Sequence, residues 1–188
     1  MRVIAGKYRS RRLRSLPGMD LRPTSDRLRE TLFDVLSAGR PEALAGGLWI
    51  DLFAGTGAVG IEALSRGAGM VYFVESSAQG AALIRSNLES LGVQAGFQVL
   101  ETNSDRALGK LEAEGAQADV VFLDPPYRMQ AEYRHVLGAL ASSKLLKPST
   151  MIIAEHPKQF DPGEVFGSVA RYRKLEQGDS ALSFYQRI

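Results

Sequence analysis

Short apolar runs alternate with amphipathic segments from residue 48 onward, and this alternation narrows the possible folds most. An apolar run that stops at a turn signal is typical of a buried strand, and the longer segments between the runs have helical periodicity. The expected strands span residues 48–53, 70–75, 97–101, 118–123 and 150–155, and the expected helices span 59–66, 77–91, 107–112 and 131–140. Such alternation predicts a parallel sheet covered on both faces.

The last part of the chain has a different pattern. Residues 165–174 and 181–188 are two strand-like segments joined by the turn Gln177-Gly178-Asp179. Two strands joined by so short a turn run antiparallel. We therefore predict an α/β protein with a Rossmann-like, mainly parallel sheet of seven strands whose last strand is antiparallel.

The first 40 residues do not follow the alternating pattern. We expect a hairpin of strands over residues 2–5 and 11–16, then a helix to about Ser37 that Thr24 or Ser25 caps. Pro41 and Gly46-Gly47 then interrupt the chain. This predicts an N-terminal extension over residues 1–40 and a main domain over 41–188.

The basic residues are concentrated in that extension. Residues 1–40 contain ten Lys or Arg against four Asp or Glu, a net charge of +6, so residues 41–188 carry −4 of the total of +2. Nine of the ten are arginines, which suit bidentate phosphate contacts and stacking on bases. A polyanionic partner is one interpretation, and an ordinary solvated face is the other.

Composition excludes several classes of site. The chain contains no cysteine, so it has no disulfide, thiol nucleophile or zinc–thiolate centre. Its two histidines are not at metal-ligand spacing, and we expect no metal site. No long apolar segment follows Met1, so we expect neither a signal peptide nor a membrane span, and a cytoplasmic protein.

A glycine-rich turn follows the first strand. Gly55, Gly57 and Gly60 match a nucleotide-binding fingerprint, in which glycines let the backbone approach a ligand and the next helix pack closely. Asp51 precedes the turn, and Glu75 ends the second strand, where a carboxylate can accept both ribose hydroxyls. An acid beside a pyrophosphate is unfavourable, whereas it suits the ammonium and sulfonium groups of S-adenosylmethionine. Asp51 therefore favours the methyl donor over a nicotinamide cofactor.

The fourth expected strand ends at Asp124-Pro125-Pro126-Tyr127. The two prolines have no amide hydrogen and fixed φ, so the chain leaves the sheet stiffly, with carbonyl acceptors beside an aromatic ring. Asp124 and the Pro125 carbonyl can accept the two hydrogens of an aromatic amino group while Tyr127 stacks on its ring. A structural turn with Tyr127 in the core is an equally good interpretation of these residues alone.

Taken together, these segments resemble the class I methyltransferases, and in particular the bacterial RsmD family, which methylates guanine N2 in small-subunit (16S) ribosomal RNA. The resemblance spans nearly the whole chain. Its motifs are Met1-Arg2-Val3-Ile4-Ala5-Gly6, Arg22-Pro23-Thr24 with Arg27, Arg29-Glu30 and Phe33, Asp51 to Gly57, Glu75, Asp124 to Tyr127, and Glu155-His156. The N-terminal motifs are the specific ones, because the glycine turn and Asp-Pro-Pro-Tyr also occur in amino-group methyltransferases that act on DNA.

The resemblance implies roles for individual residues. The cofactor-binding residues would be Asp51, Phe53, Gly55, Gly57 and Glu75, with Asn103, or its neighbour Ser104 or Asp105 instead, near the adenine. The catalytic residues would be Asp124, Pro125 and Tyr127. The RNA-binding residues would be Arg9, Arg11, Arg12, Arg22, Arg27 and Arg29. The partner would be small-subunit RNA or an assembling 30S particle, bound by a monomer.

Two other functions remain open at this point. The same site would suit an adenine-N6 methyltransferase that acts on DNA or RNA, although 188 residues leave little room for a DNA-recognition domain. A non-catalytic RNA-binding assembly factor would retain the fold without the reaction, but the acids and glycines of the expected site argue against it.

Overall fold

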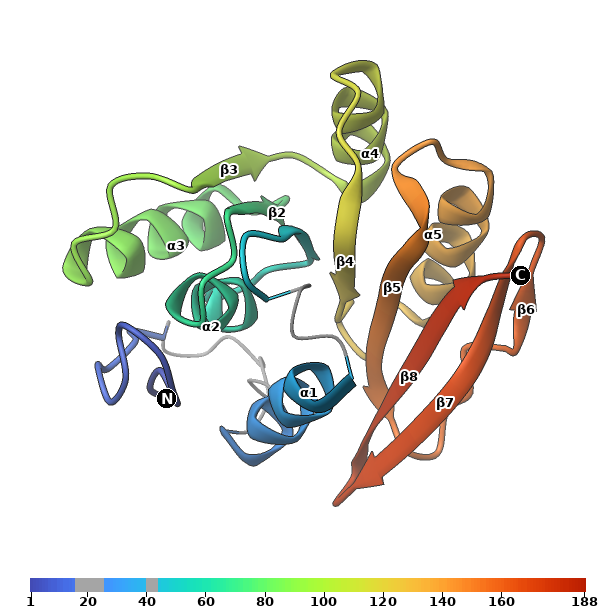
Figure 1. Ribbon diagram of the computed structural model, residues 1–188, viewed down its shortest axis with the longest axis horizontal. Helices are drawn as coiled ribbons and strands as arrows, with labels where there is room; N and C mark the ends of the chain where they lie inside the picture. Colours follow the sequence, from blue (N-terminus) through green and yellow to red (C-terminus); the bar gives the residue numbers. More distant parts are fainter. Residues whose placement is uncertain (16–25, 40–43) are drawn as a thin grey trace.

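The computed structural model describes residues 1–15, 26–39 and 44–188. At its centre lies an eight-stranded sheet with the order β3-β2-β1-β4-β5-β8-β7-β6 (Figure 1). The strands are β1 (Leu48–Leu52), β2 (Met70–Glu75), β3 (Phe97–Glu101), β4 (Ala118–Leu123), β5 (Leu146–Pro157), β6 (Val165–Phe166), β7 (Val169–Gln177) and β8 (Ser180–Arg187). Strands β1 to β5 pair in parallel, which confirms the predicted α/β class.

The antiparallel end of the sheet is confirmed, but its strand count differs from the prediction. β8 lies between β5 and β7 and is antiparallel to both. The expected strand over 165–174 is two strands, because Gly167 turns the chain at φ 54° and lets β6 pair back onto β7. The sheet therefore has eight strands instead of seven.

The helices are α1 (Asp26–Gly39), α2 (Ala58–Ser65), α3 (Ala78–Ser90), α4 (Ser104–Ala113) and α5 (Gln130–Ser142). α4 begins three residues before its predicted start, because the Asn103 side chain accepts a hydrogen bond from the Arg106 amide at 3.0 Å and caps the helix. The predicted cap of α1 at Thr24 or Ser25 lies outside the described residues.

Each face of the sheet packs against its own group of helices. α1, α2 and α3 bury apolar side chains against one face, and α4 and α5 bury theirs against the other. Trp49 of β1 is fully buried on the first face, where Phe33 of α1 stacks on it with ring centroids 5.4 Å apart. Within the described part of the chain, no helix is long and apolar enough to cross a membrane.

The N-terminal segment forms a shorter hairpin than the predicted pair of strands. Arg2 and Arg12 form an isolated antiparallel bridge, and beside it the amides of Val3 and Leu13 donate to the carbonyls of Arg11 and Met1 at 2.9 and 3.2 Å. The amides of Ile4 and Ala5 donate to the buried Glu62 carboxylate of α2 at 2.7 and 2.9 Å. The segment is therefore bonded both to itself and to α2.

Residues of the extension also contribute to the main core. Val3 and Leu13 are buried in the same apolar cluster as the helices α1 and α2. The segment therefore rests on the body of the molecule, along the side of α2 that Figure 1 shows beside the N-terminus. The division into residues 1–40 and 41–188 stays a prediction.

Candidate active site

Three acids lie at the carboxyl ends of adjacent parallel strands. Each acid lies two residues after a buried side chain of the core that α1 and α2 share. Asp51 follows Trp49, Asp124 follows Phe122, and Glu155 follows Ile153. Since side chains alternate along a strand, the three acids lie on this same face of the sheet. The ends of parallel strands are where open α/β sheets bind ligands.

The glycine turn after β1 has the conformation that its sequence predicts. Gly55 and Gly57 have φ of 55° and 76°, a region that favours glycine. Phe53 also has positive φ, 62°, which is uncommon for a residue with a Cβ and marks strained backbone at the turn. A Cβ on Gly60 would lie 2.3 Å from Phe73 of β2, so this glycine lets α2 pack closely on the sheet.

Asp51 is buried below this turn. Its Oδ2 accepts a hydrogen bond from the Gly60 amide at 2.9 Å. Burial, with a smaller contribution from the charge of Glu75, raises the pKa of Asp51 to about 7, while the Gly60 bond opposes the rise. A buried acid of this kind would gain from a cationic ligand, such as an ammonium group.

Glu75 is held by the backbone on both sides. Its Oε2 accepts from the Gly55 amide at 3.0 Å, and its Oε1 accepts from the Ser77 amide at 2.8 Å. A Cβ on Gly80 would lie 2.7 Å from Cγ of Glu75, so α3 can approach the carboxylate only because residue 80 is glycine. The carboxylate is thus fixed beside the glycine turn, and its remaining lone pairs suit ribose hydroxyls.

The residues expected near adenine lie at the start of α4. Asn103 uses its side-chain oxygen to cap the helix, and Ser104 is buried. Both follow β3, which is the neighbour of β2. A role at the adenine stays a prediction for either residue.

The Asp124-Pro125-Pro126-Tyr127 segment leaves the end of β4 as a turn, in which the Met129 amide donates to the Pro126 carbonyl at 2.7 Å. The Tyr127 hydroxyl lies 3.2 Å from Oγ of Ser180 at the start of β8, so the ring is anchored at its far end. Burial and the nearby charges of Glu155 and Asp51 raise the pKa of Asp124 well above its ordinary value. This acid therefore takes up a proton more readily than an ordinary aspartate.

Tyr133 connects two strand ends, a role that the sequence did not indicate. Its buried hydroxyl donates to the Glu155 carbonyl at 2.7 Å and lies 3.5 Å from the Pro125 carbonyl. Burial, followed by the charges of Asp124 and Glu155, raises its pKa, so the hydroxyl stays protonated. Tyr133 falls within the expected helix over residues 131–140, and nothing in the sequence pattern signalled this contact.

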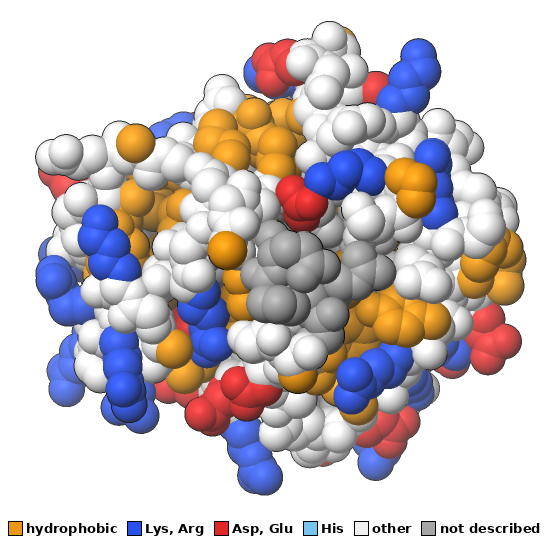
Figure 2. Space-filling view, in the orientation of Figure 1, with side chains coloured by type: hydrophobic (Ala, Val, Ile, Leu, Met, Phe, Trp, Pro, Cys, Tyr) orange, Lys and Arg blue, Asp and Glu red, His pale blue; other side chains and the backbone are white. Residues whose placement is uncertain are grey.

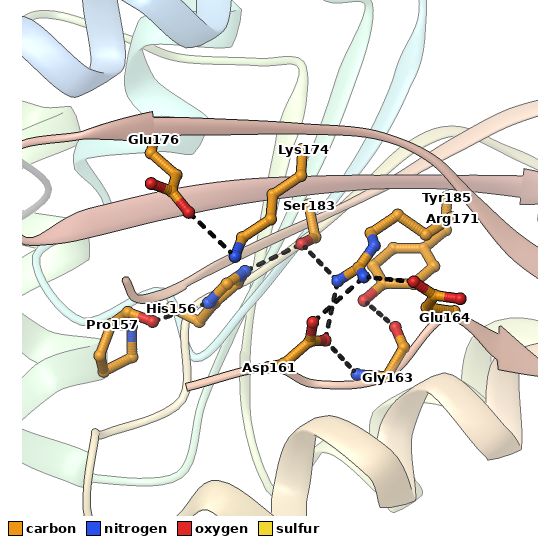
Figure 3. Close-up of polar contacts among 10 residues, drawn as sticks. All are labelled: His156, Pro157, Asp161, Gly163, Glu164, Arg171, Lys174, Glu176, Ser183 and Tyr185. Carbon is orange, nitrogen blue, oxygen red and sulfur yellow. Dashed lines mark hydrogen bonds and ion pairs between the residues drawn. The ribbon is translucent and has the colours of Figure 1, made fainter. Parts of the chain in front are cut away.

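His156 points to the other face of the sheet. Its Nε2 lies 2.8 Å from Oγ of Ser183 and its Nδ1 lies 2.9 Å from the Pro157 carbonyl. Figure 3 shows this ring joined through Ser183 to Arg171, which pairs with Asp161. Burial lowers the pKa of His156, and the network ties β5 to β8 on the α5 side. His135, by contrast, is an exposed residue that pairs with Asp105.

The arginines predicted to bind RNA have different environments. Arg9 and Arg27 are exposed and line a cavity of about 500 Å³ between the N-terminal segment and α1, together with Arg2, Asp26 and Glu30. Figure 2 shows many Lys and Arg side chains on the side of the molecule where this segment lies. Arg12 is also exposed, and Arg11 is exposed but donates to the Ser90 carbonyl at 2.8 Å. Arg22 lies outside the described residues.

The predicted RNA-binding role of Arg29 does not fit the structure, because its side chain is fully buried. It donates to the Arg2 carbonyl at 2.6 Å and to Asp26 at 2.8 Å, while its Nε and Nη1 have no hydrogen-bond partner among the described residues. Burial lowers its pKa, and the charges of Asp26, Glu62 and Glu155 oppose that effect. Arg29 is therefore a buried counter-charge to these acids and does not present a surface for RNA phosphates.

No group of His, Asp and Glu among the described residues could hold a metal ion. The site is thus built from carboxylates, backbone carbonyls and glycine amides. These groups suit a cationic cofactor and an amino group that donates hydrogen bonds.

Comparison with known proteins gives the family. A family model described as conserved hypothetical protein 95 matches residues 1–186. The ribosomal RNA small subunit methyltransferase D of Escherichia coli is 32% identical over 188 residues, which cover all of this chain and 90% of that protein. The chain belongs to the RsmD family. Members of the RsmD family are S-adenosylmethionine-dependent methyltransferases.

Other similar proteins agree with this assignment. A putative rRNA methyltransferase of Bacillus subtilis is 32% identical over 187 residues, covering all of this chain and 99% of that protein. The solved structure of a putative methyltransferase from Escherichia coli has a TM-score of 0.83 at 29% identity, covering 100% of this chain and 97% of the other. The RsmD-family fold therefore extends over the whole described chain, including the N-terminal segment.

Proposed function

We propose that this protein transfers a methyl group from S-adenosylmethionine to the exocyclic N2 of a guanine in small-subunit ribosomal RNA. The observation that carries the proposal is the position of Asp124 and the Pro125 carbonyl, which end β4 beside the Asp51 carboxylate of the neighbouring β1. The names of the relatives from Escherichia coli and Bacillus subtilis support ribosomal RNA as the substrate.

The donor would occupy the turn after β1. Asp51 would face its ammonium group, and Phe53, Gly55 and Gly57 would line its path, since the glycines leave the backbone open. Glu75, already fixed by the Gly55 and Ser77 amides, would accept the ribose hydroxyls. Asn103 or Ser104 would lie at the adenine. The cofactor supplies an electrophilic methyl group on its sulfonium.

The protein's part in the chemistry is modest. The guanine amino lone pair is delocalised into the ring, and acceptors at Asp124 and Pro125 would turn the amino hydrogens out of conjugation and stabilise the developing positive charge. Transfer would break the bond between sulfur and the methyl carbon, with its electron pair left on sulfur, as N2 formed its bond to that carbon. The amino proton then leaves to Asp124 or water. Alignment of the three atoms can supply roughly 7 to 11 kcal/mol.

The target base must leave its stack before it can reach Asp124, at a cost on the order of a few kcal/mol. Stacking on Tyr127, whose ring is anchored at Ser180, would recover about 1 to 3 kcal/mol of that cost. The cavity lined by Arg2, Arg9 and Arg27 would hold neighbouring phosphates. In this proposal residues 1–40 are the RNA-binding extension and residues 41–188 the catalytic domain of a cytoplasmic monomer that binds small-subunit RNA or an assembling particle.

The test is transfer of labelled methyl groups from S-adenosylmethionine to small-subunit particles that lack the modification, followed by digestion to nucleosides. We expect N2-methylguanosine, with loss of transfer in Asp124→Ala but not in the surface control Glu114→Gln. N6-methyladenosine would keep the reaction but replace the substrate with adenine. If RNA bound equally well to wild type and Asp124→Ala and neither transferred methyl groups, the protein would be a binding factor and the proposal would be wrong.

A further inference from the structure

The hairpin of β7 and β8 reaches the edge of the sheet at which the proposed site lies. Its two strands pair up to Gln177 and Ser180, and Ser180 is also paired with Pro157 at the end of β5. The Lys158 amide donates to the Asp179 carbonyl at 2.8 Å, so the turn of the hairpin is tied to the chain that leaves β5. The backbone of Ser180 is therefore held from both sides.

Ser180 lies farther out along this edge than Asp124 does. Leu123 of β4 pairs with Ala154 of β5, whereas Ser180 pairs with Pro157, which is three residues farther along the same strand. A strand rises about 3.3 Å per residue, so Ser180 lies roughly 10 Å beyond the last paired residue of β4. Asp124 is the next residue after that pair. The acid is thus at the base of the edge and the hydroxyl at its rim.

Tyr127 connects the turn after β4 to this rim. Its hydroxyl lies 3.2 Å from Oγ of the buried Ser180, within hydrogen-bond distance. Because β5 lies between β4 and β8 in the sheet, this contact spans the carboxyl end of β5. The Tyr127 side chain is only partly buried, so part of its surface stays open to a ligand. The ring therefore forms a wall of the site, held by its backbone at one end and by Ser180 at the other.

A base whose amino group meets Asp124 would extend outward along this wall. The amino group lies at the edge of a purine, so the rings of the base would lie farther out than the Asp124 carboxylate. That is the direction in which Ser180 holds Tyr127. Stacking depends on the relative orientation of the two rings, and a tyrosine that is held at its hydroxyl has fewer orientations than one held only by its backbone.

We propose that Ser180 is a positioning residue for the acceptor base, because its hydroxyl holds the Tyr127 ring in the orientation on which the base stacks. This inference rests on the proposed function, since it concerns the base that enters that same site. Ser180 does not itself contact the base. The β7–β8 hairpin, which contributes no reacting group, thereby becomes part of the site that receives the RNA.

The test uses Ser180→Ala and Tyr127→Phe, which remove the contact and keep the aromatic ring. With small-subunit particles that lack the modification, KM for the particle should rise about 2-fold to 10-fold in each variant, the range for one neutral hydrogen bond. The value of kcat and the Kd for S-adenosylmethionine should change by less than about 2-fold, because the ring contributes to binding of the base. The double variant should lie within about 2-fold of either single one, since both changes remove the same bond.

Two further variants separate positioning from stability. Ser183→Ala is the matched control, because it removes another buried hydroxyl of β8, one that lies 2.8 Å from Nε2 of His156 on the opposite face of the sheet. It should lower the melting temperature without raising KM. Ser180→Thr retains a hydroxyl and should keep KM within about 2-fold of wild type. Thermal unfolding of each variant shows whether it is folded.

Several outcomes would overturn the inference while leaving N2 methylation intact. They are an unchanged KM in folded Ser180→Ala, an equal rise in Ser183→Ala, and effects of Ser180→Ala and Tyr127→Phe that multiply in the double variant. Absence of N2-methylguanosine with wild-type protein would instead overturn the proposed function.

Discussion

The Tyr133 hydroxyl of α5 donates a hydrogen bond to the Glu155 carbonyl of β5 at 2.7 Å, and this contact joins a helix on one face of the sheet to an acid on the other. The same hydroxyl lies 3.5 Å from the Pro125 carbonyl. It therefore couples the position of the turn after β4 to the neighbouring strand. The segment proposed to be catalytic is therefore supported by a residue on the opposite face of the sheet.

Tyr133→Phe should lower methyl transfer mainly through kcat, because it frees the turn that carries Asp124 and Pro125. It should also lower the free energy of unfolding by about 1 kcal/mol, the usual net worth of one hydrogen bond. Urea unfolding and steady-state kinetics measure the two effects. Tyr185→Phe is the matched control, since the buried Tyr185 hydroxyl of β8 donates to the Gly163 carbonyl at 2.8 Å and does not contact the turn after β4. Equal activity losses in both variants would contradict a positioning role for Tyr133.

Glu62→Gln should loosen the N-terminal segment. The buried carboxylate accepts hydrogen bonds from the Ile4 and Ala5 amides and from Nε of Arg66, and an amide cannot accept all three. We expect a loss of about 1 to 3 kcal/mol in the free energy of unfolding. Hydrogen exchange at Ile4 and Ala5 should also become faster. Glu114→Gln, which removes only an exposed pair with Lys110, should change stability by less than about 0.5 kcal/mol. Unchanged exchange at Ile4 would rule out this anchoring role.

Gly60→Ala should destabilise the protein, whereas Gly109→Ala should stabilise it. The added Cβ at residue 60 would lie 2.3 Å from Phe73, and forcing extra volume into a packed core costs about 1 to 3 kcal/mol. A Cβ on Gly109, within α4, would meet nothing within 4 Å, so the helix gains up to about 1 kcal/mol. Thermal melts of the two variants measure the difference. Similar melting temperatures would show that α2 can shift away from β2.

Affinity for S-adenosylmethionine should increase as the pH rises through about 7. The raised pKa of Asp51, about 7, means that this acid is protonated below that pH and becomes an anion above it. The ammonium of the cofactor favours the anion. Calorimetric titrations between pH 6 and 8 measure this trend. The Asp51→Asn variant should bind S-adenosylmethionine weakly, and its affinity should lack the rise with pH that Asp51 causes.

Asp51 has the opposite pH effect on the stability of the protein without cofactor: its contribution to stability decreases as the pH rises. Because its pKa is higher in the folded chain than the ordinary 3.8, the folded state binds the extra proton between about pH 4 and 7. The contribution of Asp51 to stability therefore falls as the pH rises through this window. Urea unfolding at pH 5 and pH 7 should show a smaller decline in Asp51→Asn than in wild type. An equal decline in the two proteins would mean that Asp51 is not the group responsible.

The sequence by itself determined the α/β class, the positions of β2, β3 and β4, and the segments that surround the proposed site. These features depend on local patterns: apolar runs bounded by turn residues, glycines that must adopt positive φ, and prolines that end a strand. The glycine turn and the Asp124 to Tyr127 segment could therefore be located from the order of residues alone. The family resemblance added roles for individual residues.

Tertiary structure decided what depends on contacts between distant segments. The Glu62 carboxylate holds the Ile4 and Ala5 amides against α2, and this could not be foreseen because residues 4 and 62 meet only after folding. Burial turned Arg29 from an apparent RNA ligand into a counter-charge, because the guanidinium faces the core from α1. The neighbouring positions of Asp124 and Glu155 follow from the register of β4 and β5, which no local pattern records.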